Sequence, residues 1–199
     1  HEQAQGLKEG GADLLWLETI SAPEEFKAAA EAFSHIALPW VGTMSFDTAG
    51  RTMMGTSPGE MVELISAIPN KPIAFGANCG TGAPDLLRTV QDFAKSSPSS
   101  ILIAKGNAGI PKYVDGHILY DGTTELMAKY AVMARNSGAK MIGGCCGTKP
   151  EHLRSMRAAL ESEVMGTVPS LQQVELEIGP FSSQIRKEIE ENKSRRRRR

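Results

Sequence analysis

Three cysteines are the residues of this 199-residue sequence best suited to chemistry. Cys145 and Cys146 are adjacent within the stretch Gly143-Gly-Cys-Cys-Gly147, and Cys79 ends an apolar run that begins at Ile73. Neighbouring side chains of a regular strand point to opposite faces, so flanking glycines are needed to bend the backbone until both sulfurs converge. Three thiolates brought together predict a zinc site with one coordination position left open, which is the pattern of a catalytic zinc.

Such a site suits a substrate that contains sulfur. Soft thiolate ligands favour zinc, and zinc deprotonates a thiol that coordinates it. The product is a nucleophilic thiolate at neutral pH, which predicts alkyl transfer to sulfur. Two alternatives stay open: Cys79 as a small buried hydrophobe, and a strained disulfide between Cys145 and Cys146.

Five strands, each followed by a helix, are predicted to position the cysteines. The strands are short apolar runs, as expected for strands buried in a parallel sheet, and are predicted at residues 13–19, 40–46, 73–79, 100–105 and 140–145. Helices are predicted at residues 1–11, 21–33, 57–65, 84–95, 124–136 and 150–160. Ser21 with Glu24, and Ser57 with Glu60, match the capping box that opens a helix.

Repeated strand–helix units predict an α/β fold with a parallel sheet. A doubly wound sheet would usually carry a glycine-rich phosphate turn after its first strand, and the segment 18–21 (Glu-Thr-Ile-Ser) is not one. A (β/α)8 TIM barrel places its chemistry at the C-terminal strand ends, and polar residues follow every predicted strand. Because such a barrel needs about 250 residues, we expect residues 1–164 to form its last five βα units, with three strands missing upstream. Residues 165–199 are expected to be a C-terminal extension with a disordered arginine-rich tail.

The motifs at the predicted strand ends resemble a known family. The segments 76–79 (Gly-Ala-Asn-Cys) and 143–152 (Gly-Gly-Cys-Cys-Gly-Thr-Lys-Pro-Glu-His) are similar to those of the zinc-dependent homocysteine S-methyltransferases. Segments 17–19 (Leu-Glu-Thr) and 105–111 (Lys-Gly-Asn-Ala-Gly-Ile-Pro) also fit, and the resemblance covers about residues 1–160.

The resemblance implies a (β/α)8 barrel in which Cys79, Cys145 and Cys146 bind Zn²⁺. It also implies that Glu18 holds the amino group of homocysteine, although Glu18 has the alternative of an ion pair within the barrel. Asn78 is predicted to contact the substrate or to orient the cysteine loop.

Two further segments, Met44–Gly50 and Leu176–Ser182, look most like bacterial betaine–homocysteine S-methyltransferases. The implied reaction is methyl transfer from betaine to the thiol of homocysteine, giving methionine and dimethylglycine. The homocysteine module of cobalamin-dependent methionine synthase and an S-methylmethionine-dependent homocysteine methyltransferase stay open as alternatives. The glycine-rich Asp-Gly motif of the family's first strand has no match here, so a poorly soluble, inactive zinc-binding barrel fragment also stays open.

Composition favours an ordinary cytoplasmic protein. Apolar residues make up 41% of the chain and charged residues 23%, and no apolar run approaches the roughly 20 residues of a membrane span. Removing the five arginines of 195–199 from the net charge of −1 leaves −6, so the rest of the chain is acidic and nucleic acid is not expected as a partner. Two adjacent cysteines and an odd total fit a reducing compartment. The expected partners are homocysteine and a small methyl donor, with a homo-oligomer left open.

Overall fold

The computed structural model of the chain describes residues 1–109 and 112–183, which fold around a parallel sheet with the strand order β1-β2-β3-β4-β7. The strands of this sheet are β1 (Leu15–Ile20), β2 (Trp40–Met44), β3 (Ala74–Cys79), β4 (Leu102–Gly106) and β7 (Ala139–Gly144). The helices are α1 (Glu2–Glu9), α2 (Pro23–Ser34), α3 (Pro58–Ala67), α4 (Ala83–Ser96), α5 (Thr124–Asn136), α6 (Pro150–Ser162) and α7 (Leu171–Ile178). Each of the five predicted strands is confirmed, with its ends within two residues of the prediction.

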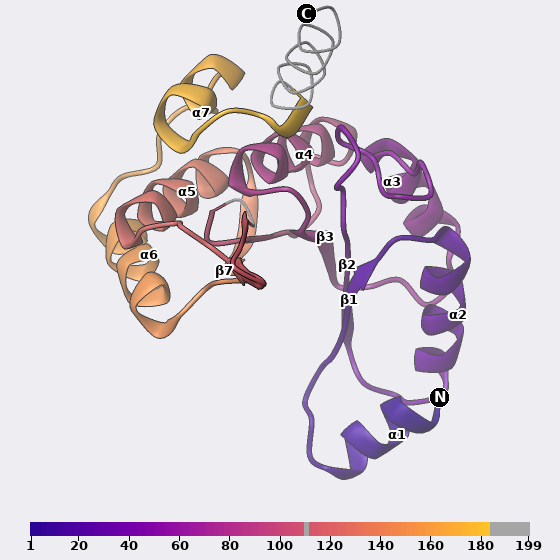
Figure 1. Cartoon of the computed structure of the whole chain (residues 1–199). Helices are drawn as coiled ribbons and strands as arrows, with labels where there is room; N and C mark the ends of the chain where they lie inside the picture. The colour runs from indigo at the N-terminus through magenta and orange to yellow at the C-terminus, as the bar shows by residue number, and fades with distance from the viewer. Residues whose placement is uncertain (110–111, 184–199) are drawn as a thin grey trace, which may run out of the picture.

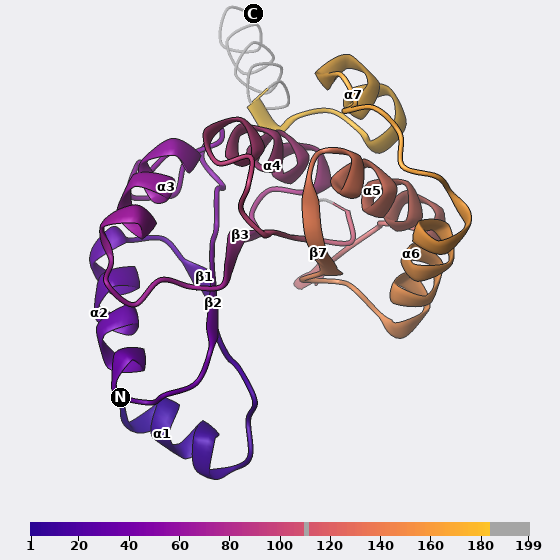
Figure 2. The ribbon, with the colours of Figure 1, turned by 180° about the vertical axis from the view of Figure 1, so that it is seen from behind.

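The sheet is curved, and helices α2 to α6 form an outer arc around its convex side (Figures 1 and 2). Every pair of neighbouring strands is parallel, from β1 with β2 to β4 with β7. Inner parallel strands surrounded by outer helices are the arrangement of a (β/α)8 barrel, so the predicted α/β fold class is confirmed. Among the described residues, five parallel strands contribute to this barrel-like arrangement.

The two faces of the sheet are packed differently. Aromatic side chains fill the space between the convex face and the helices, where Phe75 stacks edge-on against Phe93 and Trp40 packs against Phe26. The concave face carries a smaller apolar cluster, made of Val41, Ala74 and Ile103 with Leu14 and Met141 packed against it. Side chains alternate between the two faces along a strand. Every second residue after these therefore also faces the concave side, up to the C-terminal strand ends.

The two predicted capping boxes have different outcomes. Ser57 caps α3 as expected: its Oγ accepts from the Glu60 N–H at 3.3 Å, and the Glu60 carboxylate accepts from the Ser57 N–H at 2.7 Å. The prediction for Ser21 is wrong, because α2 begins one residue later, with Ala22 as an N-cap that makes no side-chain bond. Pro23 holds the preceding residue in an extended conformation, which moves the helix start past Ser21.

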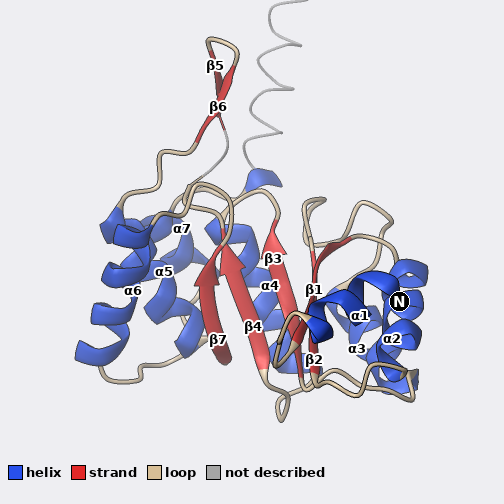
Figure 3. Cartoon of the chain, turned by 90° about the horizontal axis from the view of Figure 1, so that it is seen from below, coloured by secondary structure: helices blue, strands red, loops and turns tan. Residues whose placement is uncertain are grey.

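Two elements were not predicted from the sequence. A short antiparallel hairpin, β5 (Lys112–Val114) and β6 (His117–Leu119), projects beyond the C-terminal strand ends (Figure 3). Helix α7, in the expected C-terminal extension, buries Val174 and Ile178 and rests against α4 and α5. The arginine-rich tail lies outside the described residues, and within those residues no helix has the length and apolarity to cross a membrane.

Candidate metal centre

Strand β3 ends at Cys79, where the backbone turns sharply. Cys79 has a φ of +60°, in the left-handed region that is uncommon for residues other than glycine, and Gly80 follows with a φ of +74°. A non-glycine residue in this region costs on the order of 1–3 kcal/mol, so the surrounding structure must hold it there. The turn takes Cys79 out of the regular alternation of the strand, at the edge where β4 and β7 also end.

Cys145 and Cys146 directly follow β7 and are held by the end of β4. The Cys145 N–H donates to the carbonyl oxygen of Gly106 at 2.8 Å, and the Ala108 N–H donates to the carbonyl oxygen of Cys146 at 2.9 Å. These bonds continue the pairing of β4 with β7 past the end of the sheet. The position of the cysteine pair is therefore set by a strand that lies about 40 residues earlier in the chain.

The glycines that flank the pair are required by close packing as well as by backbone freedom. A Cβ at Gly144 would lie 2.2 Å from the Thr148 hydroxyl oxygen. Gly147 has a φ of +76°, and a Cβ there would lie 2.4 Å from the Tyr120 side chain. Replacing either glycine would displace the loop that carries both cysteines.

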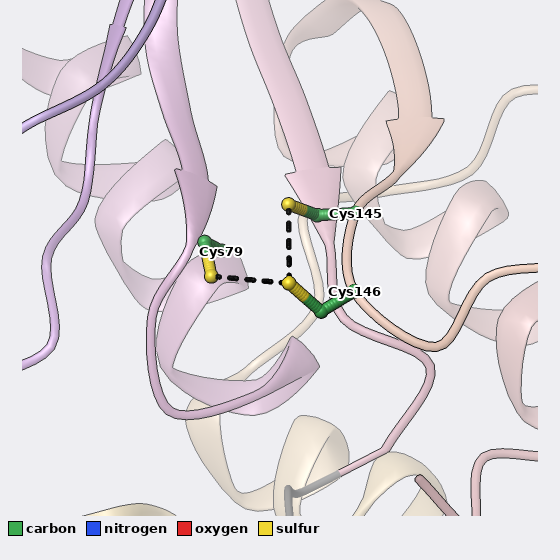
Figure 4. Close-up of side chains that lie close together, drawn as sticks. All are labelled: Cys79, Cys145 and Cys146. Carbon is green, nitrogen blue, oxygen red and sulfur yellow. Dashed lines mark hydrogen bonds between the residues drawn. The ribbon is translucent and has the colours of Figure 1, made fainter. Parts of the chain in front are cut away.

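The three sulfur atoms converge (Figure 4). The Sγ atom of Cys146 lies 3.8 Å from that of Cys79 and 4.0 Å from that of Cys145, and all three lie within 4.8 Å of one another. A tetrahedral zinc with Zn–S bonds of about 2.3 Å separates its sulfur ligands by about 3.8 Å. The donor atoms therefore fit zinc in type and in spacing. All three cysteines are free, so the alternative of a Cys145–Cys146 disulfide is not what the structure shows.

The electrostatics of the cluster favour one negative charge in the absence of metal. The hydrogen bond from Cys79 lowers the pKa of Cys145 to about 5; burial opposes this, and the Asn78 amide and the Cys146 N–H add to it. The same bond to Cys145 raises the pKa of Cys79 far above its usual value, with burial acting in the same direction. A bound cation would relieve the repulsion that keeps the remaining thiols protonated.

A comparison with protein families decides the relationship. Residues 1–160 match the family described as homocysteine S-methyltransferase. The chain belongs to this family. The match covers most of the chain and contains all three cysteines of the cluster.

Solved structures of a homocysteine methyltransferase share the fold. The homocysteine methyltransferase MmuM from Escherichia coli, in its apo form, is 23% identical with a TM-score of 0.62, over 79% of this chain and 56% of MmuM. The metallated form gives the same identity and TM-score and is covered over 51% of its length. The chain thus spans about half the length of these homocysteine methyltransferases.

Asn78, a predicted substrate-binding residue, is fully buried between β1 and the cysteine cluster. Its Oδ1 accepts from the Thr19 N–H at 3.0 Å, and its Nδ2 donates to the Thr19 hydroxyl at 2.7 Å. The same Nδ2 lies 3.8 Å from Cys145 Sγ, within the range of a hydrogen bond to sulfur. These contacts match the predicted orienting role, while contact with substrate stays a prediction.

Asn107 connects the two cysteine loops, a role that the sequence did not reveal. Its Oδ1 accepts from the Cys146 N–H at 3.1 Å, and its Nδ2 donates to the Gly80 carbonyl oxygen at 2.9 Å. Asn107 is 1% exposed, so the bonds are shielded from water. From sequence, an asparagine two residues before a glycine is as readily a turn residue as a contact residue, which hides this function.

Glu18, the other predicted substrate-binding residue, lies on the concave face near the end of β1 and forms an ion pair with Lys105 of β4. The alternative of an ion pair within the barrel is therefore present, and binding of a substrate by Glu18 stays a prediction.

His152 belongs to a different environment: its Nδ1 accepts from the Lys149 N–H at 2.9 Å, at the start of α6. Its Nε2 lies 3.1 Å from the Gly122 carbonyl oxygen, so His152 stabilises a helix terminus in this family member.

Proposed function

We propose that this chain supplies the zinc site and the homocysteine-binding face of a methyltransferase that forms methionine. The observation that carries the proposal is the convergence of Cys79, Cys145 and Cys146, with all three sulfurs within 4.8 Å of one another at the C-terminal edge of the sheet. Membership of the homocysteine S-methyltransferase family supplies the substrate class. The chain covers about half of the length of the solved relatives, so the proposal concerns the part of the active site that these residues form.

The three cysteines would hold the metal, and the residues around them fix their positions. Zinc bound there would supply the positive charge that keeps a substrate thiol deprotonated at neutral pH. Asn78 and Asn107 hold the cysteine loops through bonds to Cys145 and to Cys146. Hydrogen bonds to the residues that bind a metal orient those residues and tune the metal.

Betaine is the proposed methyl donor. The homocysteine sulfur forms a bond to one methyl carbon, the C–N bond breaks, and its electron pair stays on nitrogen as dimethylglycine. The amine of dimethylglycine takes up the proton that the homocysteine thiol loses, which balances the reaction. Segments Met44–Gly50 and Leu176–Ser182 support this donor by their likeness to bacterial betaine-dependent enzymes. S-methylmethionine and methyltetrahydrofolate through cobalamin are the competing donors.

Metal analysis tests the proposed ligands. We expect one zinc per chain in the purified protein, and loss of that zinc in Cys146→Ser, which keeps the side-chain shape. Ser137→Ala is the matched control because it removes a buried hydroxyl between the end of α5 and the start of β7, at the other end of this strand from Cys145 and Cys146. Full zinc retention in a variant that lacks all three cysteines would contradict the proposed site.

X-ray absorption at the zinc edge tests the substrate. Adding homocysteine should raise the number of sulfur ligands from three to four, and adding homoserine, which has oxygen in place of sulfur, should not. A fourth ligand that comes from the protein and does not exchange would make the zinc structural and refute the methyltransferase proposal. Three cysteines that must stay reduced also favour a reducing compartment such as the cytoplasm.

A further inference from the structure

An ion pair crosses the concave face of the sheet between two strands that are not neighbours. Glu18 is on β1 and Lys105 is on β4, and β2 and β3 lie between them. The Lys105 ammonium donates to the Glu18 carboxylate and also lies 4.8 Å from the centre of the Trp16 ring. A cation in that position is attracted by the face of the indole, so Trp16 helps to fix where the ammonium is held.

This ion pair lies beside the cysteine cluster. Lys105 is paired in register with Asn78 on β3 and with Gly143 on β7. The next residue of β4, Gly106, is paired with Cys79 and accepts the hydrogen bond of the Cys145 N–H. Lys105 is thus one residue away from the backbone position that joins the cysteine-bearing strands.

The charges of the pair are accessible for exchange. The side chains of Lys105 and Glu18 are 22% and 37% exposed, and a partly exposed ion pair contributes little to folding stability. Breaking it is inexpensive if both charges find new partners. A zwitterionic amino acid offers those partners, since its ammonium complements Glu18 and its carboxylate complements Lys105.

We infer that Lys105 recognises the α-carboxylate of a zwitterionic amino-acid thiol. When the ammonium of this ligand binds Glu18, Lys105 exchanges its bond to Glu18 for a bond to the ligand's carboxylate. The inference rests on the proposed function. The cysteine cluster, Glu18 and Lys105 together match the three polar groups of homocysteine. Lys105 therefore sets specificity for an amino acid over a simple thiol. The Trp16 ring keeps the ammonium of Lys105 close to the site.

Calorimetric titration of the zinc-loaded protein with two thiols tests this inference. The ligands are homocysteine and 3-aminopropane-1-thiol, which keeps the thiol and amine but lacks the carboxylate. Loss of one charge-assisted hydrogen bond is expected to weaken binding by about 10- to 100-fold. Lys105→Met should therefore raise the dissociation constant of homocysteine by that factor and should not raise that of 3-aminopropane-1-thiol, which has no carboxylate for Lys105 to bind. Lys105→Arg should restore discrimination.

Lys95→Met is the matched control, because Lys95 also pairs with a carboxylate, that of Asp92, but on helix α4. It should bind both thiols as the unchanged protein does. Equal weakening of both thiols by Lys105→Met, or no change for either, overturns the role of Lys105 while the proposed function stands. Failure of the unchanged zinc-loaded protein to bind either thiol overturns the proposed function and, with it, this inference.

Discussion

Replacing Asn107 with alanine should weaken both the fold and the metal site. The variant removes the acceptor of the Cys146 N–H and the donor to the Gly80 carbonyl oxygen, both in a region where Asn107 is 1% exposed. Each of the two buried groups left without a partner costs about 1–3 kcal/mol, so the free energy of unfolding should fall by roughly 2–6 kcal/mol. Loss of these bonds to the two cysteine loops should also weaken zinc binding by about 10- to 100-fold.

Two measurements separate these effects. Urea denaturation of the metal-free protein reports stability, and competition with a chromophoric chelator reports zinc affinity. Asn70→Ala is the matched control, since its amide donates to the Ala30 carbonyl oxygen at 3.2 Å, on the helical side of the sheet. The control should lose about 1 kcal/mol of stability and no zinc affinity. Equal zinc affinities in the two variants would refute the reasoning that Asn107 positions the cysteine loops.

Three further predictions concern charge, capping and packing. In the metal-free protein, Cys145 should titrate near pH 5 in ultraviolet thiolate absorbance, and this step should vanish in Cys145→Ser. Because the pKa of Cys145 is lowered from 9.0, its thiolate stabilises the fold fully above pH 9, and this stabilisation is lost as the pH falls through about 5. A midpoint of urea unfolding that is the same at pH 4 and pH 7 would contradict this prediction. Ser57→Ala should cost about 1 kcal/mol without changing zinc content, and Ser21→Ala should cost nothing measurable. Phe181→Ala should cost about 3 kcal/mol, because Phe181 is buried and packs under Arg88; a loss below 1 kcal/mol would show that the extension is loosely attached.

Local patterns allowed the elements to be predicted because their causes are local. Short apolar runs and helical periodicity depend on neighbouring residues, and so do the Ser57–Glu60 capping box and the glycines around Cys145. The Ser21 prediction failed for a reason that is also local but stronger, since Pro23 forces the preceding residue into an extended conformation. The hairpin at 112–119 was missed because strands of three residues carry too little pattern.

The sequence by itself determined the five βα units, the placement of cysteines at strand ends and, through their resemblance, the family. Tertiary structure decided which groups meet. Asn107 bonds to residues 27 and 39 positions away, and Lys105 reaches Glu18 across two intervening strands. Those contacts depend on the register and curvature of the sheet, which arise from the packing of all its strands and helices together. A cysteine pair can be recognised from its neighbours, but its supporting asparagine and the nearby lysine acquire their roles only when the strands are side by side.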